Sequence, residues 1–189
     1  MSPPRVLFAG NLGESKGVDV LIDAIAILRG RGVACELAIV GAGPEESRLR
    51  ARASRLALGD AVRWSGFVSQ RDIPEQYGAA TVTVLPSRGQ AEGLGLVLAE
   101  ALLAGSAVVG TAAGGIPEIV VDERTGLIAK DGDAQDLARQ IERLLTDGTL
   151  RARTIVEGQA RVRAAHDPRT AAARFIALYT AISRRSGSP

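Results

Sequence analysis

Two glutamates, Glu92 and Glu100, stand seven residues apart in the stretch EGLGLVLAE. Glycines at 93 and 95 mark the point where an irregular segment passes into an apolar helix, which we expect over residues 94–104. The start of a helix exposes backbone N–H groups without intrahelical partners and carries partial positive charge, and glycine lets an anion approach that backbone closely. At 1.5 Å rise per residue, the two carboxylates lie at most roughly 12 Å apart along the helix axis. This spacing suits a ligand that carries a phosphate-sized anion between two hydroxyl-rich groups, as a nucleotide sugar does.

A lysine at the start of an earlier helix adds a mobile positive charge. Lys16 directly precedes Gly17, where the first helix is expected to begin. Because a helix N-terminus already suits phosphate, a lysine beside it strengthens such a site. Taken by itself, Lys16 fits a solvated surface lysine better than a phosphate-binding residue.

Runs of Val, Leu and Ile alternate with helical patterns along the chain, which predicts βαβ units and a parallel sheet. We expect strands at about 5–10, 36–41, 62–67, 81–85 and 107–110, with a last short strand in TGLIA. Helices are expected at about 17–29, 44–58, 73–79, 94–104, 134–146, 150–165 and 168–184. About six parallel strands with helices on both faces form an α/β, doubly wound, Rossmann-like sheet, which binds ligands beyond the carboxyl ends of its strands. The loops 11–16, 66–68 and 87–95 all follow strands, so we expect them to meet in one crevice.

Length and composition fit one soluble globular domain. The chain has 189 residues, of which 46% are hydrophobic and 23% charged, so we expect a single domain over 1–189 with a disordered tail at 185–189. Aromatic residues make up only 3% and the net charge is +2, which argues against a nucleic-acid partner. The chain starts MSPPRVLFAG without a signal-peptide pattern, and its single cysteine, Cys35, suits a reducing compartment, so we expect a cytoplasmic protein.

Three other patterns have simpler interpretations. The sequence GAG at 41–43 lacks the third glycine of a dinucleotide-binding fingerprint, since Glu46 stands there. The apolar run over residues 94–113 contains Glu100, so a core helix and strand fit better than a membrane span. Arg48, Arg52 and Arg55 share one helix face, which reads as a solvated face or, alternatively, as a contact with anionic lipid at the inner side of a membrane or with a partner protein.

Several of these motifs together resemble one family. The stretch GQAEGLGLVLAEALLAGSAVVGTAAGGIPEIV resembles the donor-binding C-terminal domain of retaining GT-B glycosyltransferases of family four, the "glycosyl transferases group 1" type, whose hallmark is Glu-x7-Glu. Similar features recur, in the family's order, at FAGNLGESKGVDVLIDA, LAIVGAGPEESRL, VRWSGFV and RTGLIA. The resemblance therefore covers nearly the whole chain.

The resemblance implies a role for each candidate site residue. Glu92 would be the catalytic residue that orients the transferred sugar through its hydroxyls, and Glu100 would bind the ribose hydroxyls. The substrate-binding residues would be Asn11, Lys16, Val68, Gly93, Leu94, Gly95 and Glu100, with Lys16 on the diphosphate and the backbone of Val68 on the base. Leu94 replaces a more frequent phenylalanine. Asn11 replaces the usual arginine and so lacks a charged, bidentate contact to the diphosphate.

The implied reaction is metal-independent transfer of a sugar from a UDP-, GDP- or ADP-sugar to an acceptor hydroxyl with retention of configuration, in polysaccharide or glycolipid biosynthesis. No cofactor is expected, and no Asp-x-Asp metal pattern is apparent. In this family an acceptor-binding half normally precedes the donor domain, so we expect an acceptor domain or partner protein outside this chain and an isolated chain without activity. The alternative is a nucleotide-sugar-binding module with no transfer activity of its own. An epimerase of the same fold fits the Glu-x7-Glu pattern less well.

Overall fold

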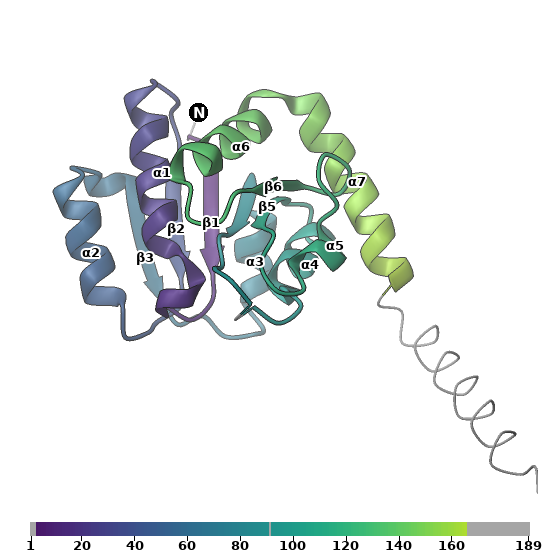
Figure 1. Ribbon diagram of the computed structural model, residues 1–189, viewed down its shortest axis with the longest axis horizontal. Coiled ribbons are helices and arrows are strands. Elements are labelled where there is room, and N and C mark those ends of the chain that lie inside the picture. The colour runs from purple at the N-terminus through teal and green to yellow at the C-terminus, as the bar shows by residue number, and fades with distance from the viewer. Residues whose placement is uncertain (1–2, 91, 166–189) are drawn as a thin grey trace, which may run out of the picture.

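A parallel sheet of six strands forms the centre of the molecule (Figure 1). The computed structural model of the chain describes residues 3–90 and 92–165. The strand order is β3-β2-β1-β4-β5-β6, and every neighbouring pair is parallel. The strands are β1 (Arg5–Ala9), β2 (Glu36–Val40), β3 (Val62–Gly66), β4 (Val82–Leu85), β5 (Ala107–Thr111) and β6 (Leu127–Ala129). This order is that of a Rossmann-type doubly wound sheet and confirms the predicted fold class.

Helices cover both faces of the sheet (Figure 1). One face carries α1, with α2 and α6 packed beside it, and the other carries α4, with α3 and α7 beside it. The helices are α1 (Val18–Gly30), α2 (Glu46–Arg55), α3 (Ile73–Gly78), α4 (Leu96–Leu103), α5 (Ile116–Ile119), α6 (Ala134–Thr146) and α7 (Gly148–Ala165). Among the described residues, none of these helices combines the length and the apolar character that crossing a membrane requires.

The inner strands are apolar on both faces because helices lie above and below them. Every residue of β4 and of β5 is buried. This burial explains why the sequence shows these strands as largely apolar runs and not as alternating patterns.

Helix boundaries differ from the expected ones where glycine or local turns intervene. The helix expected from residue 94 begins at Leu96, because Gly95 takes a left-handed conformation with φ of 70° and forms the N-cap. The helix expected over 44–58 is shortened to α2 at both ends. The helix expected at 168–184 and the tail at 185–189 lie outside the described residues.

The order of the strands reverses between β1 and β4, the place where doubly wound sheets bind ligands. The loops that follow these two strands contact each other. Arg88, in the loop after β4, ties the two loops together. Its backbone N–H donates to the carbonyl oxygen of Ser15 at 2.8 Å, and its Nη2 lies 2.9 Å from Asp19 Oδ2 on α1.

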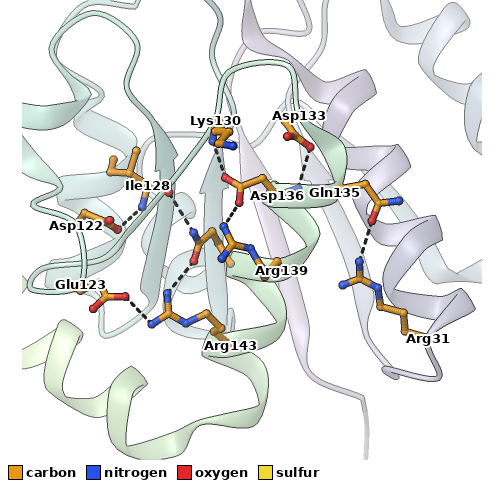
Figure 2. A network of polar contacts seen from close by, with 11 residues as sticks. Arg31, Asp122, Glu123, Ile128, Lys130, Asp133, Gln135, Asp136, Arg139 and Arg143 are labelled. Carbon is orange, nitrogen blue, oxygen red and sulfur yellow. Dashed lines mark hydrogen bonds and ion pairs between the residues drawn. The ribbon is translucent and has the colours of Figure 1, made fainter.

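The turn between β6 and α6 is held by a network of polar contacts (Figure 2). Asp133 caps α6 by accepting a hydrogen bond from the backbone N–H of Asp136 at 2.9 Å, and Asp136 Oδ2 accepts from the backbone N–H of Lys130 at 2.8 Å. Asp131, which follows Lys130 in the sequence, accepts a hydrogen bond through its carboxylate from the backbone N–H of Gly89 at 3.0 Å. This turn near the edge of the sheet therefore also supports the loop after β4.

Candidate functional site

An ion pair joins the two loops at the point where the strand order reverses. Lys16 ends a short 3-10 turn, Glu14–Lys16, just before α1, and Glu92 lies in the loop that leads to α4. Lys16 Nζ lies 2.7 Å from Glu92 Oε2, and Ser87 Oγ donates to the same oxygen at 2.6 Å. The structure thus places the lysine and the first glutamate of the sequence prediction in direct contact.

The Glu92 carboxyl group is stabilised in its charged form. Partial burial raises its pKa, but hydrogen bonds from Lys16 and Ser87, the positive charge of Lys16 and the backbone N–H of Gly93 act more strongly in the opposite direction. The net result is a pKa below the ordinary glutamate value. Glu92 is therefore an acceptor of hydrogen bonds near neutral pH, which suits binding of sugar hydroxyls and not donation of a proton.

Gly17 lets the two loops approach closely. Its φ is 63°, in the left-handed region, and a Cβ atom there would lie 2.0 Å from the carbonyl oxygen of Pro86. Since heavy atoms do not approach so closely, only glycine fits between α1 and the end of β4. The position of Lys16 beside Glu92 depends on this contact.

A second close approach fixes Glu92 from the side of β5. Gly114, in the loop between β5 and α5, has φ of 49°, and a Cβ there would lie 1.7 Å from the carbonyl oxygen of Glu92. The backbone N–H of Gly115 donates to the carbonyl oxygen of Gly93 at 2.6 Å. The segment GGIPE therefore positions the Glu92 loop although it carries no candidate binding side chain.

A cavity of about 390 Å³ opens beyond the carboxyl ends of β1, β2 and β3. It is lined by three of the predicted site residues, Asn11, Val68 and Glu100. The other lining residues are mainly small or apolar: Ala9, Gly10, Val40, Gly41, Ala42, Phe67, Gln70, Ile73, Tyr77 and Val97. The side chain of Phe67 is 83% exposed, so it offers an uncovered aromatic ring beside this cavity.

Glu100 lies on α4 among the residues that line the cavity, but its environment differs from the expected one. The apolar residues beside it in the sequence favour a buried carboxylate, but Glu100 is exposed. It sits on the outer face of α4, whose opposite face packs into the core through Leu98 and Leu102. Glu100 Oε2 accepts a hydrogen bond from the hydroxyl group of Tyr77 at 3.0 Å.

Five predicted residues do not line the cavity, namely the ion pair Lys16–Glu92 and the three residues that follow Glu92. Gly93, Leu94 and Gly95 form the connection between the ion pair and α4. Gly93 is exposed, Leu94 half-buried and Gly95 buried. Their expected backbone contacts to a phosphate or sugar stay predictions.

Sequence reasoning missed several neighbours of the predicted residues. Ser87, Tyr77 and Phe67 contact or surround the site, and none of them was a candidate. Ser87 and Phe67 follow the strands β4 and β3 closely, so their place at carboxyl ends was a usable signal. Tyr77 lies within α3, and its contact with α4 depends on tertiary packing that the sequence pattern does not show.

The arginines of α2 do not form an uncompensated positive face. Arg52 makes two contacts with the carboxylate of Asp23 on α1, with Arg52 Nε 2.7 Å from Asp23 Oδ1. Arg48 pairs with Glu45. Two of the three positive charges expected to be solvated are therefore neutralised within the chain.

Known proteins with similar sequences belong to the family that the motifs resemble. The family described as "Glycosyl transferases group 1" matches residues 1–161. The amylovoran biosynthesis glycosyltransferase AmsK of Erwinia amylovora is 36% identical over 146 residues, which cover 75% of this chain and 36% of AmsK. This chain thus spans little more than a third of that relative.

Solved structures show the same fold. HepE of Anabaena in complex with UDP has a TM-score of 0.86 and 27% identity, over 95% of this chain and 49% of HepE. The C-terminal domain of the glycosyl transferase group 1 family protein LpcC from Francisella tularensis has a TM-score of 0.78 and 25% identity, over 88% of this chain and 89% of that domain.

Proposed function

The chain belongs to the glycosyl transferases group 1 family, and from this premise we propose that it is the donor-binding half of a glycosyltransferase. It binds a nucleoside-diphosphate sugar, and the sugar passes to an acceptor hydroxyl with retention of configuration once an acceptor-binding domain completes the site. The observation that carries the proposal is the Lys16–Glu92 contact of 2.7 Å at the reversal of strand order, next to the loop that leads into α4. A positive charge, a carboxylate and the start of a helix therefore lie close together. This arrangement suits the part of the donor at which the diphosphate is bonded to the sugar ring.

Each part of the donor has a matching part of the site. The diphosphate lies against Lys16, Asn11 and the backbone N–H groups of residues 93–95, where the positive end of α4 stabilises negative charge. Glu92 accepts hydrogen bonds from hydroxyls of the donor sugar. In the reaction, Lys16 and the helix start stabilise the leaving diphosphate electrostatically, a role that needs no metal ion in this proposal.

The nucleoside occupies the cavity beyond β1, β2 and β3. Glu100 accepts from the ribose hydroxyls, and Val68 contributes backbone contacts to the base. Support comes from the fact that both residues line one cavity with Asn11. HepE, which has the same fold, binds UDP, and we extend nucleotide binding to this chain without assigning the base.

We also propose a cytoplasmic location. The single cysteine, Cys35, is a buried free thiol, which suits a reducing compartment. Contact of α2 with an anionic membrane is disfavoured. The ion pairs of Arg48 and Arg52 leave less positive charge for lipid on that helix.

Calorimetric titration with UDP, GDP and ADP, with magnesium and with a chelator, tests the proposal. We expect one nucleoside diphosphate to bind, equally well in both conditions, and Glu100→Ala to weaken it. Binding of none of the three would contradict the proposal. Adding an acceptor-domain protein then separates a half-enzyme, which transfers sugar, from the second candidate, a nucleotide-sugar-binding module that never does.

A further inference from the structure

A buried tyrosine contacts the exposed glutamate beside the cavity. Tyr77 lies on α3 and is only 2% exposed, whereas Glu100 lies on the neighbouring helix α4 and is exposed. The Tyr77 hydroxyl donates to Glu100 Oε2 at 3.0 Å, and both residues line the cavity assigned to the nucleoside. The hydrogen bond therefore connects a fixed point in the core to a side chain that would otherwise move freely in solvent.

The chemistry of the pair suits a permanent hydrogen-bond donor. Burial raises the pKa of Tyr77, and the nearby carboxylate of Glu100 raises it further. The phenol therefore keeps its proton near neutral pH and donates a hydrogen bond to the carboxylate. An ionised carboxylate has about four acceptor positions, so one bond from Tyr77 leaves the others for a ligand.

We propose that Tyr77 is a positioning residue, which holds the Glu100 carboxylate in the orientation that accepts hydrogen bonds from a ribose diol and so selects ribonucleoside over 2′-deoxyribonucleoside diphosphates. The inference rests on the proposed donor-binding function and specifies the ligand class of that site. Tyr77 acts through Glu100, since the carboxylate is the group that touches the ligand.

The physical basis is the cost of ordering a flexible side chain. A glutamate on the exposed face of a helix samples several rotamers, and fixing it when the ligand binds costs free energy. Tyr77 fixes one carboxylate oxygen before the ligand arrives, so less of that cost falls on binding. A site built to bond a substrate hydroxyl also discriminates strongly against an analogue that lacks it.

The test compares four proteins and two ligands. The proteins are the parent chain, Tyr77→Phe, Glu100→Ala and the double variant, and the ligands are the preferred nucleoside diphosphate and its 2′-deoxy form. Tyr77→Phe removes one oxygen atom and keeps the ring that packs in the core. We expect it to weaken the ribonucleotide about 5–10-fold, the order of the cost of fixing one flexible side chain on binding, and to weaken the 2′-deoxy form, which keeps only the 3′-hydroxyl, by a smaller factor. In the Glu100→Ala background it should change neither affinity.

A matched control removes a buried hydroxyl elsewhere. Ser106→Ala deletes a hydroxyl that bonds Thr83 Oγ1 at 2.9 Å and does not line the cavity, so both ligands should bind it as they bind the parent. Titrations at about 10 °C keep a less stable variant folded, and thermal unfolding checks each protein.

Three results would overturn the inference. One is unchanged ribonucleotide affinity in Tyr77→Phe, and another is an equal loss for both ligands, which would indicate a purely structural role. A loss that persists in the Glu100→Ala background would show that Tyr77 does not act through Glu100. Failure of the proposed function itself looks different, because the parent chain would then bind no nucleoside diphosphate at all.

Discussion

Lys16 and Glu92 are 76 positions apart in the sequence, yet Lys16 Nζ lies 2.7 Å from Glu92 Oε2. Their side chains are only 26% and 10% exposed, so the pair is shielded from much of the solvent. Each charge satisfies the other. In the proposed donor-binding function, Lys16 would turn towards the diphosphate and Glu92 towards the sugar.

Removing the charge of Lys16 should weaken binding of the diphosphate selectively. Lys16→Met keeps most of the aliphatic side chain but loses the charge-assisted contact, which contributes about 1.5–3 kcal/mol. We expect roughly 10- to 100-fold weaker binding of the preferred nucleoside diphosphate, with unchanged binding of the nucleoside that lacks phosphate. Calorimetry with both ligands measures the difference. Equal losses for the two ligands would mean that Lys16 supports the fold and not the phosphate.

Replacing Glu92 should separate the sugar from the nucleotide. Glu92→Gln frees Lys16 from its partner, so we expect the nucleoside diphosphate to bind as tightly as in the parent chain or a few-fold more tightly. The nucleoside-diphosphate sugar should lose affinity, because a neutral amide is a weaker acceptor for its hydroxyls. The ratio of the two dissociation constants is the measurement. An unchanged ratio would remove Glu92 from the sugar site.

The low pKa of Glu92 makes stability depend on pH. Because the folded-state pKa lies below the unfolded value, the ion pair stabilises the fold above about pH 4.3, the ordinary glutamate pKa, and this contribution is lost as the pH falls through the folded pKa. Glu92→Gln should therefore lose less stability than the parent between about pH 5 and pH 3. Urea unfolding at several pH values measures this.

The parent chain alone does not isolate the effect. The pKa of Asp136 is also lowered: burial raises it, but hydrogen bonds from Arg139 and from the backbone N–H of Lys130 act more strongly. Only the difference between the parent and Glu92→Gln reports the Lys16–Glu92 pair. Parallel curves for the two proteins would show that the pair contributes nothing to acid stability.

Gly114 should tolerate no side chain. A Cβ would lie 1.7 Å from the carbonyl oxygen of Glu92, so Gly114→Ala must displace the Glu92 loop. We expect at least 10-fold weaker binding of the nucleotide sugar and a loss of stability greater than the roughly 1–2 kcal/mol that a left-handed conformation alone costs a non-glycine residue. Gly132→Ala is the matched control, since its φ is 70° but nothing lies within 4 Å of the added atom. Similar results for both variants would refute a positioning role for Gly114.

The sequence was sufficient for the architecture because the strands are buried on both faces. Largely apolar runs such as those of β4 and β5 indicate parallel strands, and the loops that follow them converge on one edge. The exposure of Glu100 was not predictable in this way, since an apolar run with one acid fits both a buried and an outward-facing carboxylate. Only the packing of α4 through Leu98 and Leu102 decides between them.

Contacts between distant loops were also beyond the sequence pattern. The Ser87–Glu92 hydrogen bond, the Tyr77–Glu100 hydrogen bond and the close approach of Gly114 to Glu92 all depend on backbone positions that tertiary packing sets. A motif therefore identified the two glutamates, but not the residues that hold them in place.

Asn11 offers a test in which binding should improve. It is exposed and lines the cavity beside the loop that carries Lys16, where an amide supplies neither charge nor a bidentate contact. We expect Asn11→Arg to tighten binding of the nucleoside diphosphate roughly 10- to 100-fold, the equivalent of the about 1.5–3 kcal/mol of a hydrogen bond to a charged group, and to leave the nucleoside without phosphate unaffected. Asn11→Lys adds charge without the planar fork of arginine, so its gain in affinity should be smaller.

The gain in affinity should also shrink at high salt, because an exposed charge is screened. If neither substitution changed the affinity, the diphosphate would have to lie away from Asn11, and the proposed anion position would move towards the start of α4.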